Sequence, residues 1–288
     1  MVQVGTRPYT YRLVEGWAHL PRWWEMGEVA DVAISPEGLV FVYCRGAHPV
    51  LVLERDGRFV SSWGEGQFRN PHGLTFAPDG TLYLVDRDSH VVLQYTPEGR
   101  LLKTLGTRDA PSPTLFGRPF NMPAKVAFAP SGHFFVADGY GNRRVHKFAP
   151  DGTLLLSWGE PGTGPGQFAL VHSLIVDPRG RVLVCDREND RIQIFDQEGR
   201  FLGQWTGIPR PAGLALDAQG TLYVAELGSR SGPPGVSIWT LDGQCLARWS
   251  KEQCPTIAAP HALAVDARGD IYLAEVAPGR QLLKFARL

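Results

Sequence analysis

Short runs of apolar and β-branched residues recur along the chain, and a polar turn that contains glycine follows each run. The runs that open six successive copies of this pattern begin at Asp31, Gly73, Lys125, Ser173, Gly213 and Ala262. The seventh residue after each start is a glycine, at Gly38, Gly80, Gly132, Gly180, Gly220 and Gly269. Self-similarity at a spacing of 40 to 52 residues is typical of repeat architectures, in which each copy is one structural unit.

The hydrophobic pattern within each copy predicts four short β-strands. The first run and a second run of the type LYLVD or IYLAE are rich in β-branched and aromatic residues, and turns of the type PDG or PEG separate the strands. One such sheet cannot bury both of its faces, whereas six sheets arranged radially can. The sequence therefore predicts an all-β fold, a six-bladed β-propeller with four-stranded blades that occupies residues 1–288 as a single domain.

The last copy lacks one strand, because only three strands fit between Ala262 and Leu288. The segment 9–14, YTYRLV, is the candidate for the missing outer strand of the last blade. We expect this N-terminal strand to close the ring, which also removes an exposed sheet edge.

The composition is that of an ordinary globular chain, with 43% hydrophobic and 20% charged residues, and the 33 glycines and 23 prolines fit a fold with many turns. Lys and Arg number 29, as do Asp and Glu, so no global field favours nucleic acid or a membrane. We therefore expect a monomer with a small-molecule partner. The four cysteines lack CxxC spacing and the first residues lack a secretory signal pattern, so we expect a cytoplasmic protein with reduced thiols.

Features that recur in most copies are interpreted as scaffold, and function is sought in residues that break the repeat. The position before each copy alternates between alanine and histidine, in the order Ala30, His72, Ala124, His172, Ala212 and His261. Alternate blades of a six-fold ring are related by about 120°, so three imidazoles at this position can converge on the axis. Three histidines with open positions suit a catalytic zinc ion, and they also suit iron or another divalent metal. The alternative is three buried histidines that hydrogen-bond to neighbouring carbonyls.

A second break lies fourteen residues into the copy, just after the second strand. Arginine occupies it in blades one, two and four, at Arg45, Arg87 and Arg187, and blade three has Tyr140 one position later. Arginine binds carboxylates through two parallel hydrogen bonds, which predicts a small anionic substrate that bears a carboxylate. Tyr140 is a candidate for proton transfer. Loops rich in proline and glycine at 107–119, 160–166 and 228–235 are candidates for the rim of a pocket.

Several strings resemble a known family of β-propellers, the NHL-repeat proteins, and within it the peptidyl-α-hydroxyglycine α-amidating lyases. They are VADGYGN and VCDRENDRIQIF between residues 120 and 195, NPHGLTF from Asn70, YCRGAH around Arg45 and APHALAV around His261. The resemblance implies that His72, His172 and His261 bind a catalytic zinc ion. It also implies that Tyr140 is the catalytic tyrosine and that Arg45 and Arg187 are active-site arginines. The implied reaction splits an N-acyl-α-hydroxyglycine into a primary amide and glyoxylate.

The chain departs from this family at three positions. A structural calcium ion of the family is held by two backbone carbonyls, which match Val32 and Leu74, and by an aspartate. Ala262 stands in place of this aspartate, and its lack of a carboxylate argues against a calcium ion here. Gly141 replaces a disulfide cysteine that follows the catalytic tyrosine, which favours a reducing compartment. Arg87 stands where the family has no arginine, which indicates a more basic pocket and a different substrate.

Three functions follow as hypotheses. The first is a zinc-dependent lyase that cleaves the C–N bond of an N-acyl-α-hydroxyglycine. The second keeps the metal site but changes the chemistry, to a propeller hydrolase, a lactonase or a three-histidine iron enzyme acting on another small carboxylate. The third is a non-enzymatic NHL scaffold that binds a macromolecule through a face of the propeller, although the zero net charge argues against nucleic acid.

Overall fold

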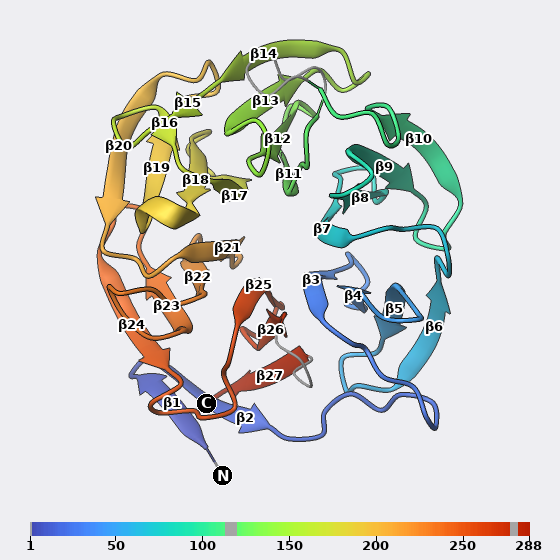
Figure 1. Cartoon of the computed structure of the whole chain (residues 1–288). Helices are drawn as coiled ribbons and strands as arrows, with labels where there is room; N and C mark the ends of the chain where they lie inside the picture. The colour runs from blue at the N-terminus through green and yellow to red at the C-terminus, as the bar shows by residue number, and fades with distance from the viewer. Residues whose placement is uncertain (1, 113–119, 277–281) are drawn as a thin grey trace. The chain divides into compact units, whose positions relative to one another are not determined.

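The computed structural model describes residues 2–112, 120–276 and 282–288, and almost all of their regular structure is β (Figure 1). The strands of these residues form six sheets of at least four strands and one two-stranded sheet, and the one short helix is η1, Arg187–Asn189. The fold is therefore a six-bladed β-propeller, as the repeat predicts. Among the described residues, no helix has both the length and the hydropathy to cross a bilayer.

The chain divides into two compact units of three blades each. The middle unit is Gly66–Arg210, and the terminal unit combines Met1–Glu65 with Pro211–Leu288. The organisation of residues 1–288 as a single domain stays a prediction.

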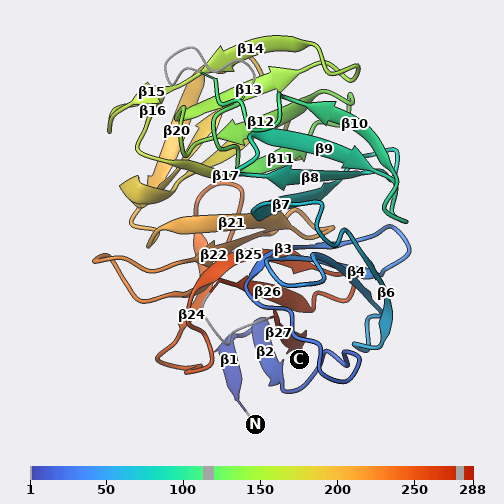
Figure 2. The same ribbon diagram turned by 45° about the vertical axis from the view of Figure 1, so that its right-hand side comes forward.

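Three antiparallel blades make up the middle unit (Figure 1). Blade two consists of β7 (Pro71–Phe76), β8 (Leu82–Asp86), β9 (Val91–Tyr95) and β10 (Leu101–Leu105). Blade three consists of β11 (Lys125–Phe128), β12 (Phe134–Asp138), β13 (Arg144–Phe148) and β14 (Leu154–Trp158). Blade four consists of β17 (Val171–Val176), β18 (Val182–Asp186), β19 (Arg191–Phe195) and β20 (Phe201–Thr206), and the short strands β15 (Glu160–Pro161) and β16 (Gln167–Phe168) pair in parallel before it. Strand β11 of blade three packs against β7 of blade two and β17 of blade four. Figure 2 shows the four strands of blade two, β7 to β10, as successive neighbours.

The terminal unit holds the other three blades. Blade one consists of β3 (Val29–Ile34), β4 (Val40–Cys44), β5 (Val50–Leu53) and β6 (Phe59–Trp63). Blade five consists of β21 (Pro211–Leu216), β22 (Leu222–Glu226), β23 (Gly235–Trp239) and β24 (Cys245–Ser250). Blade six contains β25 (Pro260–Val265), β26 (Ile271–Glu275) and β27 (Leu282–Arg287), and β25 packs against both β21 and β3.

The N-terminal segment completes blade six. Strand β2 (Tyr9–Val14) pairs antiparallel with β27, and Leu13 lies opposite Phe285. This confirms the predicted outer strand. A further strand, β1 (Gln3–Thr6), pairs with β2 and makes blade six five-stranded, which the repeat did not predict.

Burial explains why these segments form blades. The second strand of each blade is buried along its whole length, as in β8 and β12, whereas outer strands such as β10 are largely exposed. The cores of the middle unit lie between neighbouring blades, where Tyr83 of blade two packs against Phe134 of blade three and Phe134 stacks on Phe148. Each buried aromatic side chain stabilises this packing by about 1.5–3 kcal/mol.

Candidate metal centre

A β-bulge directs each repeat histidine out of its strand ladder. In blade two, Pro71 pairs with Asp86 and Leu74 is the next β7 residue in the register, which shifts across His72. His172 is skipped in the same way between Val171 and Ser173 of blade four. A bulge bends the strand and re-aims the side chain at the extra residue, and this geometry places the histidines.

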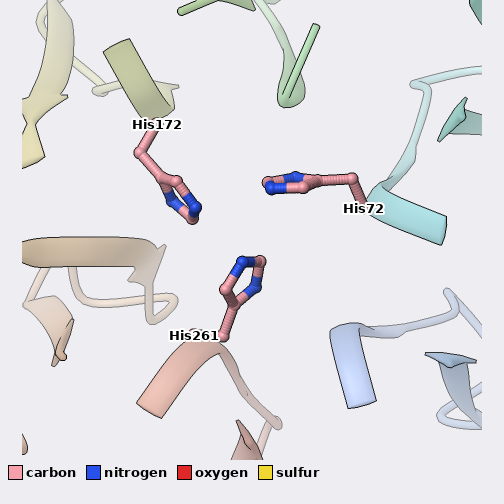
Figure 3. A group of neighbouring side chains, drawn as sticks. All are labelled: His72, His172 and His261. Carbon is pink, nitrogen blue, oxygen red and sulfur yellow. The ribbon is translucent and has the colours of Figure 1, made fainter. Parts of the chain in front are cut away.

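His72 and His172 converge on one phenol. Both side chains are buried, and their ligand nitrogens lie within 4.8 Å of each other (Figure 3). The hydroxyl of Tyr140 lies 3.0 Å from Nε2 of His72 and 3.1 Å from Nε2 of His172. The structure therefore brings together two of the predicted metal ligands and the predicted catalytic tyrosine within the middle unit.

The hydrogen bonds of His72 prepare it as a metal ligand. Its Nδ1 lies 2.8 Å from the carbonyl oxygen of Ala124, and a carbonyl can only accept, so Nδ1 carries the proton and Nε2 presents its lone pair. The Tyr140 hydroxyl has one proton and can donate to only one of the two histidine nitrogens that face it. Two imidazole nitrogens that lie this close together are a donor set that fits a metal ion.

Buried carboxylates hold the backbone that precedes each of these histidines. Asp86 accepts hydrogen bonds from the backbone N–H groups of Arg69 and Asn70, at 3.0 and 2.8 Å. Asp186 accepts equivalent bonds from Ala169 and Leu170, at 2.9 and 3.3 Å. The recurring acids are thus scaffold, as the repeat indicates, and they position the histidine-bearing bulges.

Tyr140 lies between two glycines in the sequence, and the atoms packed around each glycine leave no room for a side chain there. A Cβ atom at Gly139 would collide with the backbone of Val171, and one at Gly141 would collide with the side chain of Asn121. The backbone N–H of Gly141 donates to the carbonyl of Asn121 at 3.0 Å. The string DGYGN therefore fixes the phenol by close packing of its backbone.

Two arginines border the Tyr140 ring. The guanidinium carbon of Arg87 lies 4.8 Å from the ring centroid and that of Arg187 lies 5.6 Å from it, and Nη1 of Arg187 is 3.4 Å from the hydroxyl. Burial alone would lower the pKa of Arg87, but Asp88 and Tyr140 more than offset this and raise it. Burial would likewise raise the pKa of Glu188, but Arg210 and Arg187 lower it. Arg87 is therefore charged beside the phenol.

The other two predicted site residues belong to the terminal unit. His261 is buried and its Nδ1 lies 2.7 Å from the carbonyl oxygen of Ala30, which repeats the environment of His72. Arg45 follows β4, and its Nη1 donates to Glu28 at 2.8 Å. The participation of His261 and Arg45 in one site with Tyr140 stays a prediction.

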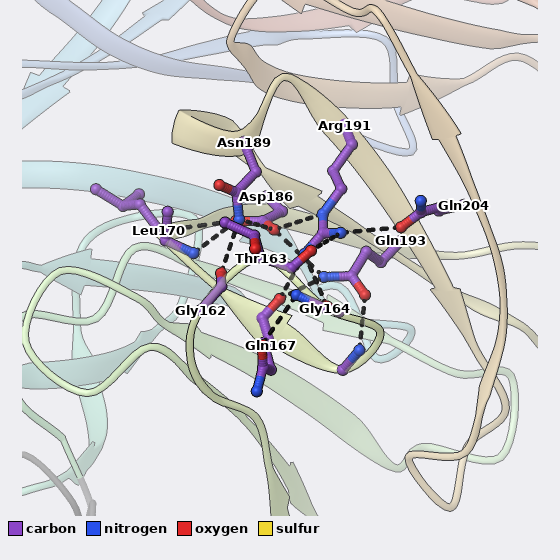
Figure 4. Close-up of polar contacts among 12 residues, drawn as sticks. Gly162, Thr163, Gly164, Gln167, Leu170, Asp186, Asn189, Arg191, Gln193 and Gln204 are labelled. Atoms are coloured by element: carbon purple, nitrogen blue, oxygen red, sulfur yellow. Dashed lines mark hydrogen bonds and ion pairs between the residues drawn. The ribbon is translucent and has the colours of Figure 1, made fainter.

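The structure reveals a clamp that the sequence did not predict (Figure 4). Arg191 is buried, and its Nε donates to Asp186 at 2.8 Å. Its terminal nitrogens donate to the carbonyls of Thr163, Gly164 and Gln167, at 2.6 to 2.9 Å. The loop at 160–166 is thus tied to the carboxylate that positions His172. Of the loop at 107–119, residues 113–119 lie outside the described residues.

The residues around Leu74 do not fit the calcium ion of the related family. The ammonium group of Lys125 donates to the Leu74 carbonyl at 2.7 Å, so a cation of the chain itself already contacts this oxygen. Ala262 stands in place of the family's aspartate and offers no carboxylate. We therefore assign no calcium to Val32 and Leu74.

Replacement of Lys125 by methionine is expected to lower the free energy of unfolding by about 1–3 kcal/mol, because it leaves the Leu74 carbonyl without its charged donor. Calcium chloride or a calcium chelator is expected to leave the Tm of the unaltered protein unchanged. Thermal unfolding measures both effects, with Lys251→Met, at an exposed turn, as the control. A Tm that rises by several degrees with calcium would refute the assignment.

Comparisons with known proteins agree with this fold. The NHL repeat model matches residues 120–148 and 168–195. NHL repeat-containing protein 3 of Homo sapiens is 34% identical over 262 residues, which cover 83% of this chain and 74% of that protein. A probable peptidyl-alpha-hydroxyglycine alpha-amidating lyase of Caenorhabditis elegans is 27% identical over 216 residues, and these cover 64% of this chain and 61% of the lyase.

Solved structures share the propeller architecture at low identity. A gluconolactonase from Xanthomonas campestris superposes with a TM-score of 0.72 at 14% identity, over 99% of this chain and 94% of that one. A likeness at this identity shows the fold alone. Together with the sequence relatives and the six blades, it leads to one conclusion: the chain belongs to the NHL-repeat family of β-propeller proteins.

Proposed function

We propose that this protein is a zinc-dependent carbon–nitrogen lyase that splits an N-acyl-α-hydroxyglycine into a primary amide and glyoxylate. The observation that carries the proposal is the position of the Tyr140 hydroxyl, at hydrogen-bond distance from two buried histidine nitrogens and beside two guanidinium groups. A base, metal ligands and cationic groups in one place are what this reaction needs. The C. elegans relative named as an amidating lyase supports the same class of reaction.

The proposed metal ligands are His72, His172 and His261, the three histidines that Figure 3 labels. His261 occupies the same repeat position as His72 and His172. It is the second residue of its strand, and the register of blade six shifts at this position, between Pro260 and Ala262. Its Nδ1 faces a carbonyl as that of His72 does, so Nε2 is again the atom available to a metal. When bound, zinc would supply Lewis-acid polarisation of the substrate hydroxyl.

Tyr140 is the proposed general base. Its phenolate takes the proton of the substrate hydroxyl, and the electron pair of that O–H bond forms the carbonyl of glyoxylate as the C–N bond breaks. The departing amide nitrogen receives a proton, which Tyr140 can return, so that atoms and charge balance. Arg187, with Arg45 of the terminal unit, binds the substrate carboxylate, and the position of Arg187 beside the hydroxyl supports this role.

The proposal is tested by the release of glyoxylate from N-benzoyl-α-hydroxyglycine by protein loaded with one equivalent of zinc. We expect equimolar glyoxylate and benzamide, and loss of both products in His172→Ala. A loaded protein that releases neither product but hydrolyses sugar lactones would replace the lyase with the hydrolase alternative. A loaded protein that is inactive on both substrate classes would favour the binding scaffold.

A further inference from the structure

Blades two and four each present an acid–arginine–acid motif, one on either side of Tyr140. The motif is Asp86-Arg87-Asp88 in blade two and Asp186-Arg187-Glu188 in blade four. In both blades the first acid holds the backbone before a repeat histidine, and the arginine follows the second strand. The last acid accepts a hydrogen bond from the arginine Nε, at 2.7 Å in blade two and 2.8 Å in blade four.

The neighbouring acid holds each guanidinium group through a different set of nitrogens. Asp88 engages the Nε of Arg87, so the paired terminal nitrogens of Arg87 are suited to a two-point contact with a carboxylate. Glu188 engages both Nε and Nη2 of Arg187. The side chains of Arg87 and Arg187 are only 23% and 11% exposed, so they are held in place rather than free in solvent. Both guanidinium groups border the Tyr140 ring.

The two arginines come from opposite sides of blade three. Strand β11 packs between β7 of blade two and β17 of blade four, and Tyr140 follows the second strand of blade three. Arg87 therefore reaches Tyr140 from the side away from Arg187. The Nε of Arg87 is paired with Asp88, and a single substrate carboxylate next to Arg187 does not reach the terminal nitrogens of Arg87 on the other side of the phenol.

We propose that Arg87 binds a second carboxylate, on the acyl part of the substrate, so that the natural substrate is an N-acyl-α-hydroxyglycine whose acyl chain ends in a carboxylate. This inference rests on the proposed lyase function and specifies its substrate class. One carboxylate, of the hydroxyglycine, binds to Arg187, and the second binds to Arg87 across the phenol. Arg87 is thus a specificity-determining residue of the site.

The experiment compares two substrates of similar length, N-succinyl-α-hydroxyglycine and N-pentanoyl-α-hydroxyglycine, which differ in the terminal carboxylate. We expect the unaltered protein to favour the succinyl substrate by about 10- to 100-fold in kcat/KM, the effect of a two-point charged contact. In Arg87→Met this ratio should fall to about 1. The ratio is insensitive to a general loss of folded protein, which would lower both values equally. Arg69→Met, at an exposed arginine paired with Asp109, is the matched control and should retain the preference.

Equal use of the two substrates by the unaltered protein, or an unchanged ratio in Arg87→Met, would overturn the inference and leave the lyase function intact. If neither substrate reacts, the lyase function fails, and calorimetry of glutarate and butyrate binding decides about Arg87. Tighter binding of glutarate that Arg87→Met abolishes would still support a dicarboxylate site. Equal binding of the two acids would overturn it.

Discussion

Replacement of Tyr140 by phenylalanine is expected to lower kcat for glyoxylate release by about 10²- to 10⁴-fold, the range that a positioned general base contributes. The variant keeps the ring, which packs against His72 and His172, and removes only the hydroxyl that both Nε2 atoms face. Metal content should therefore be retained. Steady-state kinetics with quantification of bound metal separates the two effects.

The matched control is Tyr95→Phe, which removes a hydroxyl that donates to Gln67 in the same unit. This variant should keep its activity within about twofold, because the hydroxyl that it removes donates to Gln67, which is not a proposed site residue. If Tyr140→Phe retained activity within threefold while metal stayed bound, proton transfer by Tyr140 would be excluded.

Replacement of Arg191 by methionine is expected to lower the free energy of unfolding by about 3–5 kcal/mol, the effect of removing one partner from a buried ion pair. Asp186 would remain fully buried after losing its charged partner at 2.8 Å, and the loop carbonyls of Thr163 and Gly164 would lose the Arg191 donor. Urea unfolding measures the change. We also expect weaker metal binding, because Asp186 holds the backbone before His172.

Arg200→Met is the control for this prediction. Arg200 is 80% exposed at the side chain and lies 3.9 Å from Asp196, a surface pair that contributes about 0–1 kcal/mol. A free energy of unfolding for Arg191→Met within 1 kcal/mol of that of the Arg200 variant would show that the loop at 160–166 holds without the clamp.

The repeat made much of this site predictable from sequence. Residues that alternate between blades, such as His72 and His172, stand out against scaffold residues that every blade shares. The fold brings these equivalent positions of blades two and four close together. Tyr140 was found by the same comparison, because it breaks the pattern one residue after the arginine position. The N-terminal strand of blade six followed from the count of strands per copy.

Other features depend on contacts that the repeat does not encode. The clamp joins the Arg191 side chain to backbone carbonyls of an irregular loop, and carbonyls carry no sequence signal. The bond from Lys125 to the Leu74 carbonyl likewise joins a side chain to a backbone atom 51 residues away. Strand β1 adds an edge outside the repeat, so no frame position predicts it.

The most direct test of the account is the metal content of His261→Ala, because the proposal requires one metal ion bound by His72, His172 and a histidine of the terminal unit. After dialysis against a weak chelator, mass spectrometry should find about one zinc ion per chain in the unaltered protein. The same value is expected in His19→Ala, at an exposed histidine of the same unit. His261→Ala should retain less than about a tenth of that amount, because a site of three protein ligands loses one of them. Full metal content in His261→Ala would contradict the three-histidine centre.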